Sequence, residues 1–160
     1  MSKMNNKLID TLKNETNSLK VQFIDFTKEY VTNEFNTICN MTYDQINEKW
    51  GYFDFKWNRY CQSKKSLAIW GKRELMRHQG LDKTISIAVT NAEQHYEDSI
   101  IKLALRIESK GLNIESLKCT TSHVGRNINT TLTDGIKTVR AFTIIAEGEI
   151  QKPHYRYLVK

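Results

Sequence analysis

The stretch that decides the fold class is residues 111–146, GLNIESLKCTTSHVGRNINTTLTDGIKTVRAFTIIA. Before Gly111 the apolar residues recur every three to four positions, as in amphipathic helices, and after it they alternate every second position, as in strands. Asp134-Gly135 separates two β-branched runs, 127–133 and 136–146, and predicts a hairpin with a type I′ turn. The chain is therefore expected to be an α+β protein, with helices first and a three- to four-stranded antiparallel sheet last.

Two further strands are expected on either side of this hairpin. Residues 117–123 alternate in the same way, and residues 150–159 add a last strand, which Pro153 places at an edge of the sheet. A regular alternation along 136–146 makes two sets of side chains face opposite ways. The set expected to face the helices is Val139, Ala141, Thr143 and Ile145, and the set expected to face away is Thr138, Arg140, Phe142 and Ile144.

About four helices are expected upstream of Gly111. The first covers 4–38, and the second begins at a capping box, Thr42-Tyr43-Asp44-Gln45. An aromatic stripe is expected to continue this second helix as far as Cys61; its members are Tyr43, Ile46, Trp50, Phe53, Trp57 and Cys61. The third helix covers 66–79 and ends at Gly80, and the fourth is capped by Asp82 and ends at Gly111.

The first helix carries a short heptad-like seam. Its members are Leu12, Leu19, Phe23 and Phe26. A helix this long and amphipathic often packs against another copy of itself, so a homodimer through the N-terminal helix is an expectation. A structural, self-assembling protein is accordingly one of the alternative functions.

Length and composition are typical of one domain. The 160 residues are 39% hydrophobic, enough for one core, and we expect a single domain over 1–160, with a helical part, 1–111, and a β part, 112–160. No run approaches the roughly 18 apolar residues of a membrane span, and the N-terminus lacks the apolar segment of a secretory signal, so the expected location is the cytoplasm. Three widely spaced cysteines are expected to be reduced thiols.

The positive charge is concentrated in one segment. Residues 56–83 hold eight Lys/Arg and two Asp/Glu, an excess equal to the net charge of +6 for the whole chain. Basic residues interleaved with tryptophan and tyrosine suit a polyanion, because the cations meet phosphates while an exposed ring stacks on a base. The candidate residues are Lys56, Arg59, Lys64, Lys65, Lys72, Arg73 and Arg77. Two other interpretations remain open, namely a solvated helix face and a surface that binds an acidic protein.

A second candidate patch lies in the predicted sheet. Neighbouring strands are expected to gather basic and aromatic side chains able to hold a phosphate or a nucleotide. Its members are Arg126, Arg140, His154, Tyr155 and Arg156. The alternative is an edge strand protected by charge.

No catalytic signature is present. The sequence contains no G-x-S-x-G, G-x-x-x-x-G-K-[ST], H-E-x-x-H or G-x-G-x-x-G motif, and its histidines and cysteines lack metal-ligand spacing. We therefore expect a protein that is not an enzyme, with no catalytic residues, no cofactor and no bound metal.

The closing run 134–160, DGIKTVRAFTIIAEGEIQKPHYRYLVK, resembles the ends of small uncharacterised proteins carried by bacteriophages and mobile elements. The resemblance implies a phage origin, hence the host cytoplasm, where such proteins often act by binding host or defence components. The leading interpretation is a non-catalytic basic protein that binds nucleic acid or a nucleotide-like phosphate ligand. The second is a protein-protein inhibitor or adaptor of the anti-defence type.

Overall fold

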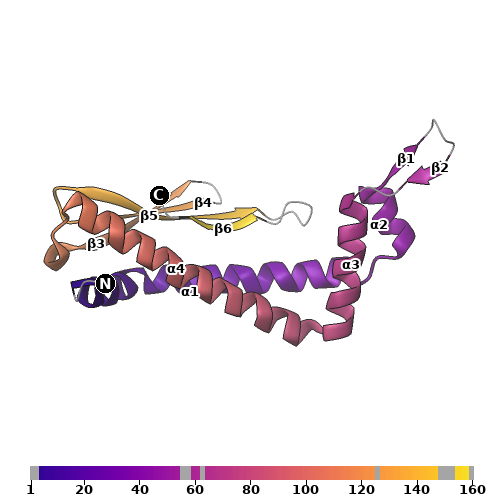
Figure 1. The fold of residues 1–160 in the computed structure, drawn as a ribbon, viewed down its shortest axis with the longest axis horizontal. Coiled ribbons are helices and arrows are strands. Elements are labelled where there is room, and N and C mark those ends of the chain that lie inside the picture. Colours follow the sequence, from indigo (N-terminus) through magenta and orange to yellow (C-terminus); the bar gives the residue numbers. More distant parts are fainter. Residues whose placement is uncertain (1–3, 55–58, 62–63, 125–126, 148–153, 159–160) are drawn as a thin grey trace. The chain divides into compact units, whose positions relative to one another are not determined.

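The computed structural model describes residues 4–54, 59–61, 64–124, 127–147 and 154–158 (Figure 1). Its α-helices are α1 (Met4–Ile38), α2 (Tyr43–Trp50), α3 (Lys64–Gln79) and α4 (Leu81–Lys110). A 3-10 helix, η1 (Ile114–Ser116), follows, and the strands are β1 (Tyr52–Asp54), β2 (Arg59–Cys61), β3 (Lys118–Val124), β4 (Asn127–Thr133), β5 (Thr138–Glu147) and β6 (His154–Leu158). Long helices followed by an antiparallel sheet confirm the predicted α+β class.

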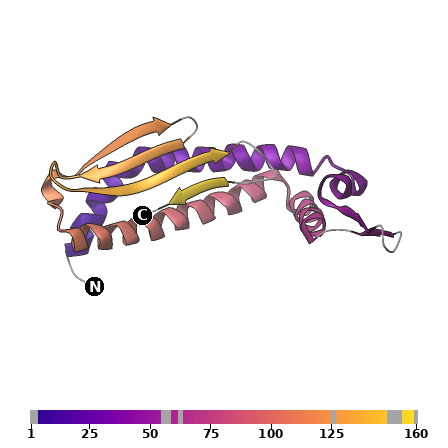
Figure 2. The same cartoon turned by 90° about the horizontal axis from the view of Figure 1, so that it is seen from above.

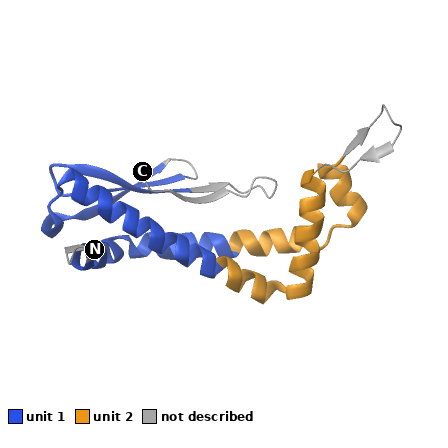
Figure 3. Cartoon of the chain, in the orientation of Figure 1, with its two compact units in different colours: residues 1–28, 89–160 blue, residues 29–88 orange. Residues whose placement is uncertain are grey.

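The chain divides into two compact units (Figure 3). Unit 1 comprises residues 1–28 and 89–160, and unit 2 comprises residues 29–88. Both α1 and α4 contribute residues to each unit. We still predict that the whole chain is one domain, in the sense of one cooperative folding unit. The division into two compact units does not test this prediction.

Unit 1 is a four-stranded antiparallel sheet with two helical segments on one face (Figures 1 and 2). The strand order is β3-β4-β5-β6, so the last strand lies at an edge, as predicted. The core joins the sheet to the N-terminal part of α1 and the C-terminal part of α4. Its fully buried side chains include Leu8, Leu12, Leu19, Tyr96, Ile100, Leu103, Ile107, Leu132, Phe142 and Ile144.

The heptad-like seam of α1 lies inside this core. Leu12, Leu19 and Phe23 are buried, and Phe26 packs against the same cluster. Thr16, in the same stripe, is buried too, with its hydroxyl 2.8 Å from the Tyr96 hydroxyl. The seam expected to hold a second copy is therefore occupied by the chain's own α4 and sheet.

A β-bulge changes which side chains of β5 face the helices. Thr130 pairs with Phe142 and Thr131 with Arg140, which leaves Ala141 as the extra residue. Across the bulge the alternation shifts by one position, so Val139, Phe142 and Ile144 all lie on the core face. The prediction that Phe142 and Ile144 face away was wrong, because a regular period of two does not account for the bulge.

The β4–β5 hairpin is confirmed, but its turn differs from the prediction. Thr133 pairs with Thr138, so the loop has four residues, Asp134 to Lys137, and is not a two-residue type I′ turn. Gly135 adopts the expected positive φ, +92°. The Asp134 carboxylate accepts backbone N–H bonds from Lys137 (2.7 Å), Asn113 (2.8 Å) and Ile136 (2.9 Å), which organises the longer loop and ties it to the segment after α4.

Unit 2 begins its short helix as expected and ends it earlier. The Thr42 hydroxyl and the Gln45 side chain form the predicted capping box at the start of α2. The helix ends at Trp50, where Gly51 is extended, and β1 and β2 pair in an antiparallel hairpin, Tyr52 with Cys61. The prediction of a helix as far as Cys61 was wrong. Gly51 disfavours helix, and the aromatic residues after it favour strand as strongly as they favour an apolar helical stripe.

The junction between α3 and α4 is a single glycine. Gly80 has φ +88° and follows the last residue of α3, as predicted for a C-terminal glycine. Because α4 already begins at Leu81, Asp82 lies in its first turn and is not the capping residue, which corrects the sequence interpretation. The Asp82 carboxylate still lies near the positive end of the helix dipole.

Candidate binding surface

The basic residues predicted to bind a polyanion lie mostly on α3. Lys64, Lys65 and Arg77 are exposed on this helix. Lys56 lies outside the described residues, and Arg59 is described only through its backbone pairing with Asp54 in the β1–β2 hairpin. The two remaining candidates, Lys72 and Arg73, have partners within unit 2.

Lys72 neutralises a buried carboxylate. Its Nζ lies 2.7 Å from Oε1 of Glu34 on α1, and the Glu34 side chain is only 5% exposed. The Tyr30 hydroxyl donates to the other carboxylate oxygen at 2.6 Å. Since a buried carboxylate without compensating partners is costly, the first role of Lys72 is to hold α3 against α1 within this unit.

Arg73 points into unit 2. The residue is buried, and its Nε donates to the Met41 carbonyl at 2.6 Å. Its Nη1 donates to Glu74 at 2.9 Å, and the guanidinium carbon lies 4.6 Å from the centre of the Trp70 ring. Tyr43 contacts the same ring edge-on, with ring centres 4.8 Å apart. Arg73 therefore links α3 to the segment between α1 and α2.

The opposite face of α3 carries an exposed stripe that the sequence analysis did not single out. Its members follow 3-4-4-3 spacing and are all exposed: Lys64, Leu67, Gly71, Leu75 and His78. We call these five residues the outer stripe. Leu67 and Leu75 are 53% and 57% exposed, which makes them the most apolar part of the stripe. The sequence signal for this stripe was a leucine four residues before and four residues after Gly71. The sequence of α3 does not indicate, however, which face of the helix is buried.

Gly71 lies at the centre of the outer stripe, and no contact among the described residues requires a glycine at this position. A Cβ added there would meet nothing within 4 Å, and the position is interior to a regular helix. Glycine at such a position destabilises a helix by roughly 0.5–1 kcal/mol relative to alanine. The missing side chain leaves a flat notch between two exposed leucines, where another backbone can approach closely.

Of the C-terminal candidates, the backbone register separates Arg140 from the residues of β6. Arg126 lies outside the described residues, and Arg140 is exposed on β5. In β6 the backbone pairs His154 with Glu147, Tyr155 with Ala146 and Arg156 with Ile145. These partners lie five to seven residues beyond Arg140, roughly 16–23 Å at the rise of a strand. This register therefore does not support one shared patch of Arg140 with His154, Tyr155 and Arg156.

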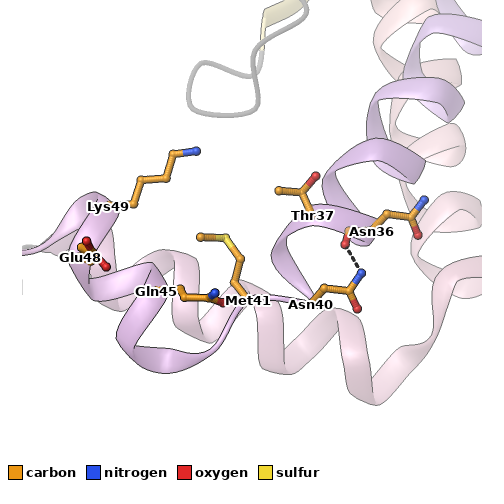
Figure 4. A pocket seen from close by; sticks show the side chains of 7 residues that line it. All are labelled: Asn36, Thr37, Asn40, Met41, Gln45, Glu48 and Lys49. Atoms are coloured by element: carbon orange, nitrogen blue, oxygen red, sulfur yellow. Dashed lines mark hydrogen bonds between the residues drawn. The ribbon is translucent and has the colours of Figure 1, made fainter.

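An open hollow of about 660 Å³ lies between the end of α1 and α2 (Figure 4). Its lining is Asn36, Thr37, Asn40, Met41, Gln45, Glu48 and Lys49. Asn40 donates to the Asn36 carbonyl at 2.5 Å, and Gln45 accepts from the Thr42 N–H at 2.8 Å. One carboxylate and one ammonium group balance each other, so the hollow offers amide donors and acceptors without a net charge that would attract phosphate. The sequence signal for this hollow was a pair of asparagines, Asn36 and Asn40, four residues apart near the end of α1.

Neither Cys39 nor Cys119 has the environment of an activated thiol. Burial raises the pKa of Cys119, and the neighbouring Glu15 carboxylate raises it further. Burial also raises the pKa of Cys39, against the opposing charges of Arg73 and Arg77. Within the described ranges, no group of three or more His, Cys, Asp or Glu side chains is arranged to hold a metal ion.

Comparison with protein-family models, with curated proteins and with solved structures finds no match for this chain. Of the helices in the described part of the chain, none is both long enough and apolar enough to span a membrane.

Proposed function

We propose that the chain is a non-catalytic binding protein that docks on another protein through the outer stripe of α3. The observation that carries this proposal is Gly71, an exposed helical glycine between two leucines that are more than half exposed. Leaving these leucines in water and a glycine inside the helix lowers stability. A partner that covers the stripe removes both costs, because it buries the leucines and uses the notch for close approach.

The exposed charges of α3 are mostly positive, which favours an acidic partner, and the one carboxylate of this helix, Glu74, is paired with Arg73. Lys64 and Lys65 are exposed at the start of α3, and Arg77 is exposed near its end. A partner helix with an apolar strip and carboxylates at its rim would complement this pattern, with the leucines supplying affinity and the charges supplying orientation and association rate. This corresponds to the inhibitor or adaptor interpretation of the sequence.

Nucleic acid or a nucleotide-like phosphate ligand is the second candidate. Exposed Lys64, Lys65 and Arg77 favour it, since none of the three has an ion pair among the described residues. Lys64 and Arg77 are 13 positions apart, about 20 Å along a helix, so they would contact separate phosphates. Such binding would weaken steeply with added salt and would not require the leucines.

A phage origin is part of the same proposal and rests on the resemblance of residues 134–160 to phage and mobile-element proteins. In that setting the chain would act in the host cytoplasm, and its acidic protein partner would be a host or defence component.

The test compares the outer stripe with a matched pair of exposed apolar residues. The double variant Leu67→Ser, Leu75→Ser removes the apolar part of the stripe. Ile101→Ser, Leu105→Ser is the control on α4, where the two side chains, four residues apart, are comparably exposed at 46% and 54%. We expect wild type and the control to capture one host protein from nuclease-treated lysate, identified by mass spectrometry. The stripe variant should capture at least tenfold less of that protein. Gly71→Ala should weaken the same capture while raising the free energy of unfolding by about 0.5–1 kcal/mol.

Two results would contradict the proposal. One is equal capture by the stripe variant and the control. The other is a ligand that disappears on nuclease treatment and depends on Lys64 and Lys65 instead of the leucines, which would establish the second candidate.

A further inference from the structure

The edge strand β3 is the least protected backbone of the sheet. It has seven residues, pairs with β4 on one side only and lies at the end of the strand order, as the outermost strand in Figure 2. Edge strands are usually guarded by charges, prolines or bulges, because their unpaired N–H and C=O groups accept another strand. From Cys119 to Val124 this strand has no Asp, Glu, Lys, Arg or Pro.

One hydrogen bond shows which backbone groups point outward. The Cys119 N–H donates to Oε1 of Glu15 on α1 at 3.0 Å, so it points away from β4. Backbone direction alternates along an antiparallel strand, so Thr121 and His123 also direct their N–H and C=O groups to the open side. Glu15 thus occupies the first outward position, Cys119, and leaves the outward positions at Thr121 and His123 open.

These two positions are accessible. Thr120, Thr121, Ser122 and His123 are all exposed, so neither face of this end of the strand is covered. Among the described residues, none hydrogen-bonds to the outward backbone groups of Thr121 and His123. Thr121 and His123 are two open positions separated by one residue. This pattern is complementary to itself, because on an antiparallel second copy His123 can lie opposite Thr121 and Thr121 opposite His123.

We propose that β3 pairs with β3 of a second copy of this chain, antiparallel, about a two-fold axis at Ser122. In this register Thr121 lies opposite His123 of the second copy and His123 lies opposite its Thr121. The two pairs exchange four main-chain hydrogen bonds. The Glu15–Cys119 bond is kept, and the five residues that pair, 120–124, contain no Asp, Glu, Lys or Arg, so no such charges oppose each other.

A second copy fits this edge better than a flexible peptide. Both strands are already ordered by pairing with their own β4, so their association does not have to order a new segment. An isologous two-fold contact requires a patch that is complementary to itself, and the alternating pattern at Thr121 and His123 meets that requirement. The sheets of the two copies would join into one eight-stranded sheet, twice the four strands of one chain.

The register is tested by cross-linking at the axis. In the proposed dimer Ser122 faces its own copy in a non-hydrogen-bonded pair, with Cα atoms about 4.5 Å apart, within the usual range for a disulfide. Ser122→Cys should therefore form a covalent dimer under mild oxidation, seen on a non-reducing gel. Thr120→Cys is the matched control, because its copies would lie about 13 Å apart along the strand direction. Wild type under the same oxidation measures any contribution of the native cysteines.

The interface itself is tested with Thr121→Pro, which removes an outward N–H and leaves the bonds to β4 in place. We expect light scattering to give the mass of a dimer for wild type and of a monomer for Thr121→Pro, with unchanged circular dichroism. A wild-type monomer at high concentration, a dimer that survives Thr121→Pro, or equal cross-linking of Ser122→Cys and Thr120→Cys would overturn the proposal.

Discussion

At the residue scale, neighbouring cations on α3 differ in what they contact. Lys72 reaches a buried carboxylate, and Arg73 donates to a carbonyl and a carboxylate inside unit 2. Lys64 and Lys65 are exposed. Composition counts all four as one basic segment, whereas their environments separate cations that stabilise the fold from cations that are available to a partner.

Lys72→Ala should lower the free energy of unfolding by about 1–3 kcal/mol, because the Glu34 carboxylate, to which the Tyr30 hydroxyl donates, is then left buried without its ammonium partner. Lys65→Ala, on the same helix, should change it by less than about 0.5 kcal/mol. Denaturant unfolding of both variants measures the difference. Adding Glu34→Gln to Lys72→Ala should recover part of the lost stability, since the amide carries no charge. If Lys72→Ala and Lys65→Ala were equally stable and Glu34→Gln recovered nothing, Lys72 would not be a structural partner of Glu34.

At the element scale, the β4–β5 hairpin depends on one carboxylate. Three backbone N–H groups, chiefly that of Lys137, lower the pKa of Asp134 from 3.8 to about 2. A lowered pKa in the folded state means that the ionised carboxylate stabilises the hairpin above its ordinary pKa, and that this contribution is lost as the pH falls toward 2.

Asp134→Asn keeps an acceptor oxygen but removes the charge. We expect the variant to be less stable than wild type at neutral pH, with a gap that narrows below about pH 4 and closes near pH 2. Denaturant midpoints across this range measure the gap. A gap that stays constant with pH would show that the charge does not contribute.

Much of the element structure could be predicted from local signals. The bounds of α1, the capping box of α2, Gly80, Gly111 and the β4–β5 hairpin each depend on residues close together in the chain. The predictions failed where two local signals competed. Aromatic residues after Gly51 suit a helical stripe or a hairpin, and a bulge at Ala141 is invisible to a count of alternating residues.

At the scale of the whole molecule, the division into two units bears on cooperativity. The helices α1 and α4 each supply residues to both units, so unfolding of one unit should destabilise helix that belongs to the other. We therefore expect the single unfolding transition that the sequence predicts for one domain.

The placement of tryptophan makes this testable, because all three tryptophans lie between residues 29 and 88 and their fluorescence reports on unit 2. Leu103→Ala, in the core of unit 1, should cost about 2–5 kcal/mol. It should lower the midpoint seen by tryptophan fluorescence as much as the midpoint seen by circular dichroism. A fluorescence midpoint that does not move would mean two independent domains.

The sequence by itself determined the α+β class, the order of helices and strands and most of their ends, because periodicity, caps and turn glycines act over a few residues. Only the tertiary structure decided which cations of α3 are engaged, that the α1 seam is buried, that the outer stripe is exposed and that β3 is an open edge. Each of these depends on residues far apart in the chain, such as Glu34 and Lys72 or Glu15 and Cys119, whose contacts follow from packing and not from any local pattern.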